Sequence, residues 1–309
     1  MDIQSLYYFS ELAKDLHITR TAKRLYLSQQ TLSNHIQRLE EHYGVELLKR
    51  KPVLAFTPAG EAVLEFANLV LKEQDHLNDR ISEICKREKG VIRFGASLLE
   101  IESCIPRIIP EFVKRYPNVE IHTNSALSSK LASMIYTGDL DLAITYSSNV
   151  DSRLNFRYLA DDPILMCVPE ELLKLHYPNE AEALKRKSQT EAYVSDFSKL
   201  SFCMLSNSMG PQIERCFAEA GLTPNIYMTS AFSRITSSIC IQNQAVSFIT
   251  KSALMATSDF TQKNINFFPL YSSEGPVIQK IYLIWDKELY LSDHIKYFID
   301  LVTNYRAEP

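Results

Sequence analysis

The stretch LYYFSELAKDLHITRTAKRLYLSQQTLSNHIQRLEEHYGVELLKR, residues 6–50, decides the fold of the N-terminal part of the chain. Apolar residues recur at helical spacing in its first turns, and Thr19 is expected to cap a second, short helix. Ser28 offers the N-cap of a third helix, and Gly44 offers its C-terminal stop. Three helices with a tight turn at residues 26–28 predict a helix-turn-helix.

The third predicted helix has two distinct faces. Its apolar stripe, which must face a core, consists of Leu32, Ile36, Leu39 and Tyr43. The opposite face is rich in amides and hydroxyls and consists of Gln30, Asn34, Gln37, Arg38 and Glu41, flanked by Thr31 and Ser33. Asn and Gln can pair bidentately with adenine in the major groove of DNA, which favours a reading helix. An ordinary solvated helix face is the alternative, because every surface helix has a polar side.

A possible wing follows this helix. The chain continues as VELLKRKPVLAF, residues 45–56, in which two short apolar strands flank Lys49, Arg50 and Lys51. This pattern predicts a hairpin with a basic tip, which could reach phosphates or the minor groove beside the reading helix. A solvated turn with no DNA contact is the alternative.

A long helix is expected next. Thr57 and Pro58 are a strong helix start, and no helix breaker follows before Gly90. Apolar residues at nearly heptad spacing form a narrow seam along this helix: Val63, Phe66, Val70, Leu77, Ile81 and Ile84. Such a seam favours a dimeric coiled coil, and packing against the helix's own domain is the alternative.

The remainder of the chain alternates strands with helices. Strands are expected at 91–96, 119–123 and 141–145, with helices at about 105–116 and 128–137 between them. This βαβαβ order implies a parallel sheet with helices on its faces. Further strands are expected at 164–168, 200–205, 225–228, 245–250 and 280–285, and a last helix at 292–305. We therefore expect two α/β lobes, with a ligand near the carboxyl ends of the strands.

Composition limits the possible functions. The 309 residues carry a formal charge of −4, whereas residues 1–57 hold eight Lys or Arg and six Asp or Glu, a net of +2. A small DNA-binding head on an acidic body fits this modest asymmetry. The six cysteines form no CxxC pair, and no HExxH, P-loop, GxSxG or nucleotide-type GxGxxG motif is present. We therefore expect no metal, no cofactor and no enzymatic activity. The chain shows no membrane-span pattern and no signal-peptide layout at its N-terminus, so the expected location is the cytoplasm.

Over essentially its whole length, the sequence resembles the LysR-type transcriptional regulators. The residues that carry the resemblance are 6–50 and the segments FTPAGEAVL (56–64), VIRFGAS (91–97), PRIIPEFVKRYPNVEI (106–121), GDLDLAI (138–144), CFAEAGLTP (216–224) and VSFIT (246–250). The chain departs from the family pattern at Gln30 (usually Pro), Thr31 (Ala), Asn34 (a basic residue), Leu98-Leu99 (Pro-Thr), Asn243-Gln244-Ala245 (a glycine pair) and Thr250 (Pro). These departures concern the operator and the effector rather than the fold.

The resemblance implies an α/β chain of three parts. These are a winged helix-turn-helix at 1–57, a linker and dimerisation helix at 58–89, and an effector-binding domain at 90–309 that resembles a type 2 periplasmic binding protein. Lobe I of that domain would span about 90–161 and 269–309, and lobe II about 162–268. The implied partners are a double-stranded DNA operator, a small-molecule effector, further copies of the chain in a homodimer or homotetramer, and RNA polymerase at target promoters.

The implied contact residues fall into two groups. Arg20, Arg24, Arg38, Lys49, Arg50 and Lys51 would neutralise phosphates, and Ser28, Gln29, Gln30, Thr31, Ser33 and Asn34 would contact the operator from the front of the third helix. The effector would meet Ser97, Ser128, Ser206, Asn207 and Thr250. Ser128 as a simple N-cap and Ser97 as a simple turn residue are the alternatives. Helix N-termini suit an anion, but Glu100 and Glu102 repel one, so a neutral or cationic effector stays open.

Two other classes of protein compete with this interpretation. One is an enzyme or solute-binding protein with a helical cap, which the missing catalytic motifs and the missing signal peptide disfavour. The other is a regulator that senses oxidants through cysteine, which would need a reactive thiolate.

Overall fold

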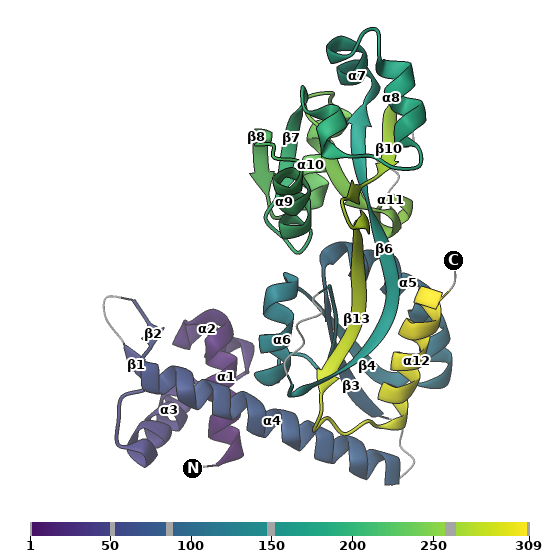
Figure 1. The fold of residues 1–309 in the computed structure, drawn as a ribbon. Helices are drawn as coiled ribbons and strands as arrows, with labels where there is room; N and C mark the ends of the chain where they lie inside the picture. Colours follow the sequence, from purple (N-terminus) through teal and green to yellow (C-terminus); the bar gives the residue numbers. More distant parts are fainter. Residues whose placement is uncertain (1, 50–52, 85–88, 147–151, 257–263, 308–309) are drawn as a thin grey trace.

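The computed structural model describes residues 2–49, 53–84, 89–146, 152–256 and 264–307. It consists of a small helical head, one long helix that runs from the head beneath the body, and a body of two α/β lobes joined by two long strands (Figure 1). The elements therefore fall into three parts along the chain.

The head is a three-helix unit with its own apolar core. Its helices are α1 (Ile3–Asp15), α2 (Ile18–Arg24) and α3 (Gln29–Tyr43). Ser28 caps α3 as expected, because its Oγ accepts the Thr31 N–H at 3.0 Å, and Gly44 ends the helix at φ +70°. The expected cap at Thr19 is wrong: α2 begins earlier, where His17 Nδ1 accepts the Arg20 N–H at 3.3 Å. Phe9, Leu32 and Leu39 are fully buried in the core between the helices.

The wing is shorter than expected. Strands β1 (Leu48–Lys49) and β2 (Ala55–Phe56) pair antiparallel, with Leu48 opposite Phe56. Val53 lies outside the paired part and its side chain is exposed. Arg50 and Lys51, expected at the basic tip, lie outside the described residues.

The long helix α4 (Pro58–Ile84) starts where the sequence predicts, with the Gly60 N–H donating to Thr57 Oγ1 at 3.0 Å. The expected apolar seam is partly wrong, because it divides between two faces of the helix. Val63 is buried in the head core, and Val70 packs against that core. Phe66, Leu77 and Ile81 are exposed, whereas the side chain of Ile84 lies outside the described residues. Val63 and Val70, seven residues apart, stay on the side of the helix that the head covers, whereas Phe66 lies on the uncovered side.

Lobe I contains the expected βαβαβ unit. Its strands lie in the order β4-β3-β5 and are parallel. Helices α5 and α12 cover one face, where Phe298 packs edge to face with Phe94 and with Phe112, and α6 covers the other face. The bounds are β3 (Lys89–Ala96), α5 (Leu98–Arg115), β4 (Asn118–Ser125), α6 (Ser128–Tyr136), β5 (Leu142–Thr145) and α12 (Asp293–Ala307).

Two antiparallel strands, β6 (Leu154–Pro169) and β13 (Ile278–Asp286), run from one lobe into the other (Figure 1). They make the large sheet mixed, in the order β10-β6-β13-β5-β3-β4, where β10 is Ile265–Pro269. The expected parallel pairing holds within the βαβαβ unit, but β13 joins β5 antiparallel. The strand expected at 164–168 is only the last part of β6. Its first part is half exposed and carries charged residues, and therefore lacks the apolar run of a buried strand.

Lobe II has a separate apolar core that includes Phe197, Phe202 and Phe248. Its strand β7 pairs in parallel with β8, and both β9 and β10 pair antiparallel with β6. Its elements are α7 (Glu170–His176), α8 (Ala181–Ser188), a 3-10 turn (Val194–Phe197), β7 (Ser201–Leu205), α9 (Gly210–Glu219), β8 (Asn225–Ser230), α10 (Ser233–Ile241), β9 (Ser247–Thr250), α11 (Lys251–Ala256), β10 (Ile265–Pro269), β11 (Tyr271–Ser272) and β12 (Gly275–Pro276). The implied start of the second part of lobe I at 269 is therefore too early, because Leu270 and Val277 belong to the core of lobe II.

Candidate nucleic-acid interface and effector cleft

The polar face of α3 is exposed and its side chains are partly ordered by one another. Gln30 Nε2 donates to Asn34 Oδ1 at 3.0 Å, and the Thr19 hydroxyl donates to Gln29 Oε1 at 3.2 Å. Ser28, Gln29, Gln30, Asn34 and Arg38 are exposed, whereas Thr31 and Ser33 are half-buried. In Figure 1, α3 and the wing lie at the end of the molecule away from the two lobes. The predicted base-contacting side chains therefore form one accessible surface.

The predicted phosphate-binding residues do not share one environment. Arg20, Arg38 and Lys49 are exposed. Arg24 instead faces its own head: Nε donates to Asp15 at 2.9 Å, Nη2 donates to the Glu11 carbonyl at 2.8 Å, and Nη1 pairs with the Glu11 carboxylate. These hydrogen bonds to Glu11 and Asp15 raise the pKa of Arg24. Arg24 therefore ties α1 to α2, and we propose that it serves the fold rather than the DNA phosphates.

A cleft of about 930 Å³ lies between the two lobes, and all five predicted effector residues line it. Its walls are the segments that follow β3, β4, β7 and β8, together with residues at the end of β9 and on β13. The strands that end there bring side chains from residues 97 to 279 into one cavity. The residues expected from the resemblance are Ser97, Ser128, Ser206, Asn207 and Thr250.

The structure defines a local role for Ser97 and Asn207 and removes one expected for Ser128. Ser97 caps α5, because its Oγ accepts the Glu100 N–H at 3.3 Å. Ser128 is the first residue of α6 and not its cap, since Leu127 holds the N-cap position, so the simple N-cap alternative is wrong. Asn207 spans its loop: Nδ2 donates to the Ala231 carbonyl at 3.1 Å and Oδ1 accepts the Met209 N–H at 3.0 Å.

Two polar residues of the cleft gave no signal in the sequence. The Tyr146 hydroxyl, from the end of β5, donates to Glu100 Oε1 at 2.6 Å, and burial raises the pKa of Tyr146. Gln279, on the crossing strand β13, is only 1% exposed, and its Nε2 has no hydrogen-bond partner among the described residues. Neither belongs to a motif, because each is brought to the cleft by sheet pairing. A buried amide donor that lines a cleft without a partner is a feature that a ligand can satisfy.

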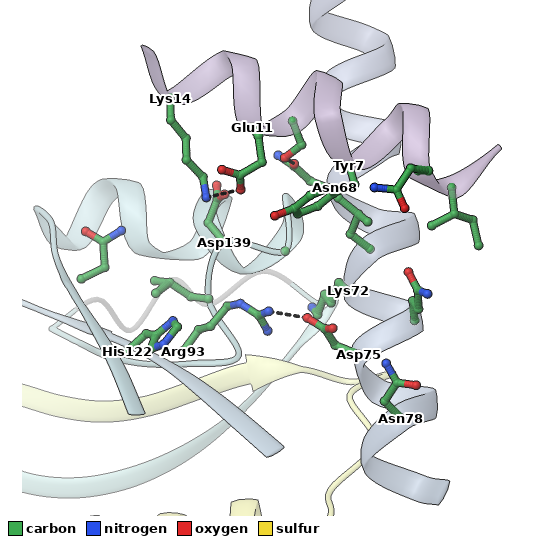
Figure 2. Close-up of a pocket in the computed structure, with 18 of the residues that line it drawn as sticks. Tyr7, Glu11, Lys14, Asn68, Lys72, Asp75, Asn78, Arg93, His122 and Asp139 are labelled. Carbon is green, nitrogen blue, oxygen red and sulfur yellow. Dashed lines mark hydrogen bonds and ion pairs between the residues drawn. The ribbon is translucent and has the colours of Figure 1, made fainter. Parts of the chain in front are cut away.

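A second cavity, of about 690 Å³, separates the head and α4 from lobe I (Figure 2). Arg93 from β3 pairs with Asp75 of α4 there, and its backbone N–H donates to Asp141 Oδ2 at 2.7 Å. Lys72, only 5% exposed, donates from Nζ to the Ile135 carbonyl at 3.3 Å. Helix α6 therefore begins at the cleft and ends against the long helix α4.

The thiols have the chemistry of structural residues. The five described cysteines are buried and carry no disulfide. Burial raises the pKa of Cys104 and Cys240 to about 12 and that of Cys203 and Cys216 to about 11. A high pKa keeps a thiol protonated near neutral pH, which disfavours oxidant sensing by these four residues.

Within the part of the chain that the structure describes, neither a metal-binding cluster nor a membrane-spanning helix is present. No group of three or more His, Cys, Asp or Glu side chains there is arranged to hold a metal ion. None of the described helices is long and apolar enough to cross a bilayer.

Comparison with known proteins matches both parts of this architecture. Residues 3–61 match the model of the bacterial regulatory helix-turn-helix protein, lysR family, and residues 86–307 match the LysR substrate binding domain. The Hca operon transcriptional activator HcaR of Escherichia coli K12 is 26% identical over 250 residues, 81% of each chain. These matches are to regulators of transcription and not to enzymes, in agreement with the expectation from the sequence.

Solved structures share the fold over the whole chain. Full-length OxyR from Pseudomonas aeruginosa, solved as a single-residue variant, superposes with a TM-score of 0.72 at 19% identity, covering 100% of this chain and 95% of that one. CbnR in complex with its target DNA gives a TM-score of 0.68 at 19% identity, covering 99% of this chain and 100% of that one. With both domain models matched in order along one continuous fold, this chain belongs to the LysR family of transcriptional regulators.

Proposed function

We propose that this protein is a cytoplasmic, dimeric or tetrameric regulator that binds an operator through its head and a small molecule between its lobes. The observation that carries the proposal is the pairing, in one chain, of an exposed amide-rich face on α3 with an interlobe cleft. CbnR, whose fold this chain shares, is known in complex with its target DNA, which supports the first half. By analogy with HcaR, whose name is that of an activator, RNA polymerase is the expected partner at target promoters.

DNA affinity and DNA specificity come from different residues in this proposal. Arg20, Arg38 and the basic wing neutralise phosphates, which gives affinity for any duplex. The amides of Gln29, Gln30 and Asn34 address base edges, with Ser28, Thr31 and Ser33 beside them. Because the Gln30 and Asn34 side chains already hold one another, they meet the groove as one preorganised pair.

Two copies of the chain associate through the exposed side of α4. Phe66, Leu69 and Leu77 are each 43% to 55% exposed and follow one another on the face that the head core leaves uncovered. Ile81 continues this face toward the end of the helix, and Val63 is withdrawn from the expected seam because the head buries it. A long helix with one uncovered apolar stripe is stabilised by a second helix of the same kind.

The effector enters the cleft and uses groups that the lobes leave available. Ser97, Ser128, Ser206 and Thr250 supply hydroxyls, and Gln279 supplies a donor at the cleft floor. Glu100 is 3% exposed and lines the same cavity. Because its carboxylate repels negative charge, an anionic group of the effector would lie in the part of the cleft away from Glu100. A neutral or cationic group beside Glu100 is the arrangement that electrostatics favours.

Helix α6 offers a direct route from the cleft to the head. Its first residues line the cleft, and its last turn accepts the Lys72 hydrogen bond from α4. A ligand that binds one lobe arrangement more tightly shifts α6, and α4 carries that shift to the two heads.

The test combines footprinting with ligand binding. Genomic footprinting of the protein should reveal an interrupted palindrome with half-sites about one helical turn apart, roughly 34 Å. A single unrepeated site bound by a monomer would contradict the dimer. Compounds made or consumed by the products of the regulated genes are then tested for thermal stabilisation of the protein.

Gln279→Leu separates ligand binding from folding. The variant should lose the stabilisation by the ligand, yet its own melting temperature should not fall, because leucine removes a buried amide nitrogen that lacks a partner and only one long hydrogen bond, from Ser208 Oγ to Gln279 Oε1 at 3.5 Å. Equal stabilisation of the variant and the wild type would remove Gln279 from the site.

A further inference from the structure

Tyr26, in the turn between α2 and α3, has an unusual combination of backbone and side-chain environment. Its φ is +56°, in the left-handed region, and its side chain is 97% exposed. Left-handed backbone is disfavoured for residues with a Cβ and especially for bulky ones. An aromatic ring that stays in water contributes no burial free energy. Neither the left-handed backbone nor the exposed ring of Tyr26 therefore stabilises the head.

The hydrogen bonds around Tyr26 define the kind of helix end. The Tyr26 N–H donates to the Lys23 carbonyl at 3.2 Å, and the Leu27 N–H donates to the Ala22 carbonyl at 2.8 Å. This pair of bonds is the Schellman pattern, in which the residue after the C-cap turns left-handed and is usually glycine. Tyrosine occupies that position here. The local fold therefore gives a reason for a glycine or an asparagine, but none for a phenol.

The position of Tyr26 suggests what the phenol does. Ser28, two residues later, caps α3, and Gln29 and Gln30 open the reading face. We propose that Tyr26 is a DNA-contacting residue that donates a hydrogen bond from its hydroxyl to a phosphate beside the bases read by α3, with its ring against the adjoining sugar. This inference rests on the proposed binding of DNA by the head. Hydroxyl side chains are regular donors to DNA phosphates.

The chemistry of this contact differs from that of a cation. A neutral hydroxyl releases no counterion, so its loss lowers affinity without changing the salt dependence of binding. The contact is also independent of base sequence, since phosphates are the same everywhere. A mixed-sequence duplex is therefore a sufficient probe, and the operator need not be known.

The experiment measures binding of the full chain to a mixed-sequence duplex two helical turns long, at several salt concentrations, together with thermal unfolding. Tyr26→Phe should bind roughly three- to tenfold more weakly with an unchanged salt slope. Tyr26→Asn should bind at least as weakly, while its melting temperature is equal to or above that of the wild type, because asparagine tolerates left-handed backbone. Tyr7→Phe, which removes a hydroxyl from α1 at the junction with lobe I (Figure 2), is the control and should bind normally.

The outcomes distinguish this inference from the function on which it rests. Normal binding by both Tyr26 variants overturns the contact and leaves DNA binding intact. A parallel loss of affinity and melting temperature in Tyr26→Asn also overturns it, because Tyr26 would then support the fold. If the wild type itself binds no duplex while remaining folded, the proposed function fails and the Tyr26 contact fails with it.

Discussion

The reading face and the effector cleft are built in opposite ways. The reading face comes from the polar side of one helix and its cap, within residues 28–38, and its side chains are exposed or half-buried and close in sequence. The cleft gathers residues between 97 and 279 from both lobes, and its most enclosed polar groups, Glu100 and Gln279, are almost fully buried. A change on the reading face is therefore expected to stay local, whereas a change in the cleft alters the fit between two lobes.

The strongest test of this contrast removes the proposed dimer without touching either site. Phe66→Glu with Leu77→Glu places charges on the exposed side of α4, while the head core, which contains Val63 and contacts Val70, stays intact. We expect monomers in sedimentation velocity and operator affinity lower by a factor on the order of 100, because two linked heads bind as one unit. Leu175→Glu, on an exposed position of lobe II, is the control. A double variant that keeps its oligomer and its affinity would contradict the α4 interface.

The next largest effect concerns base reading. Asn34→Ala should cost about 1–3 kcal/mol on the cognate operator and little on random DNA, because an amide pairs with a base edge. Arg38→Ala should weaken both DNAs alike and lower the salt slope by about one. Binding curves at several salt concentrations separate the two. If Asn34→Ala lowered the affinity for both DNAs equally and also reduced the salt slope, Asn34 would be a phosphate contact and not a base contact.

A third test asks whether an arginine near the reading helix serves the fold or the DNA. Arg24→Ala removes the bonds to Glu11 and Asp15 and should lower the free energy of unfolding by about 1 kcal/mol, a modest value because the side chain is 38% exposed. The salt slope of DNA binding should not change. Arg20→Ala, on the same short helix, should show the reverse: unchanged thermal unfolding and a slope lower by about one. An Arg24→Ala variant with normal unfolding and a lower slope would restore Arg24 as a phosphate contact.

The smallest expected effect lies in lobe II, far from the head. Burial pushes the pKa of Glu170 upward, but hydrogen bonds from Asn266, Lys174 and Lys185 outweigh it and lower the pKa to about 2. Because this pKa lies below that of an unfolded glutamate, about 4.3, the carboxylate stabilises the lobe above that pH. The stabilisation, roughly 1 kcal/mol, is lost as the pH falls toward 2.

Glu170→Gln should therefore flatten the decline of stability between about pH 4.3 and pH 2, measured by thermal or urea unfolding in that range. Glu171→Gln, the exposed neighbour, is the matched control and should behave as the wild type. DNA binding at neutral pH should be the same in both variants. An unchanged acid profile for Glu170→Gln would show that its three partners do not stabilise the charged form.

The head could be predicted from the sequence because its signals are local. The cap at Ser28, the apolar stripe at Leu32, Ile36 and Leu39 and the stop at Gly44 all depend on spacing within one helix, and the structure has each of them. Tyr43, the last residue of the expected stripe, is exposed instead. The cap expected at Thr19 is instead made by His17, two residues earlier, a shift that helical spacing alone does not resolve. The βαβαβ unit was predictable for the same reason, since each element carries its own periodicity.

The cleft was predictable only in part. The five residues taken from the resemblance to the family do line it, but Tyr146 and Gln279 carry no local signal. They reach the cleft because β5 ends there and because β13 crosses between the lobes. The split of the α4 seam has a similar origin, since only the packed head determines which side of the helix it covers.

The helix-turn-helix, the long helix after Pro58, the alternation of strands and helices and the membership of the family all follow from the order of the amino acids. The role of Arg24 as a tie between α1 and α2, and the exposure of Tyr26 in a left-handed turn, became visible only in the packed molecule. The same holds for Lys72, which joins α4 to the end of α6 across 63 residues of sequence. The physical reason is that periodicity records which side of an element is apolar, whereas the partner of a polar group is set by how distant elements pack.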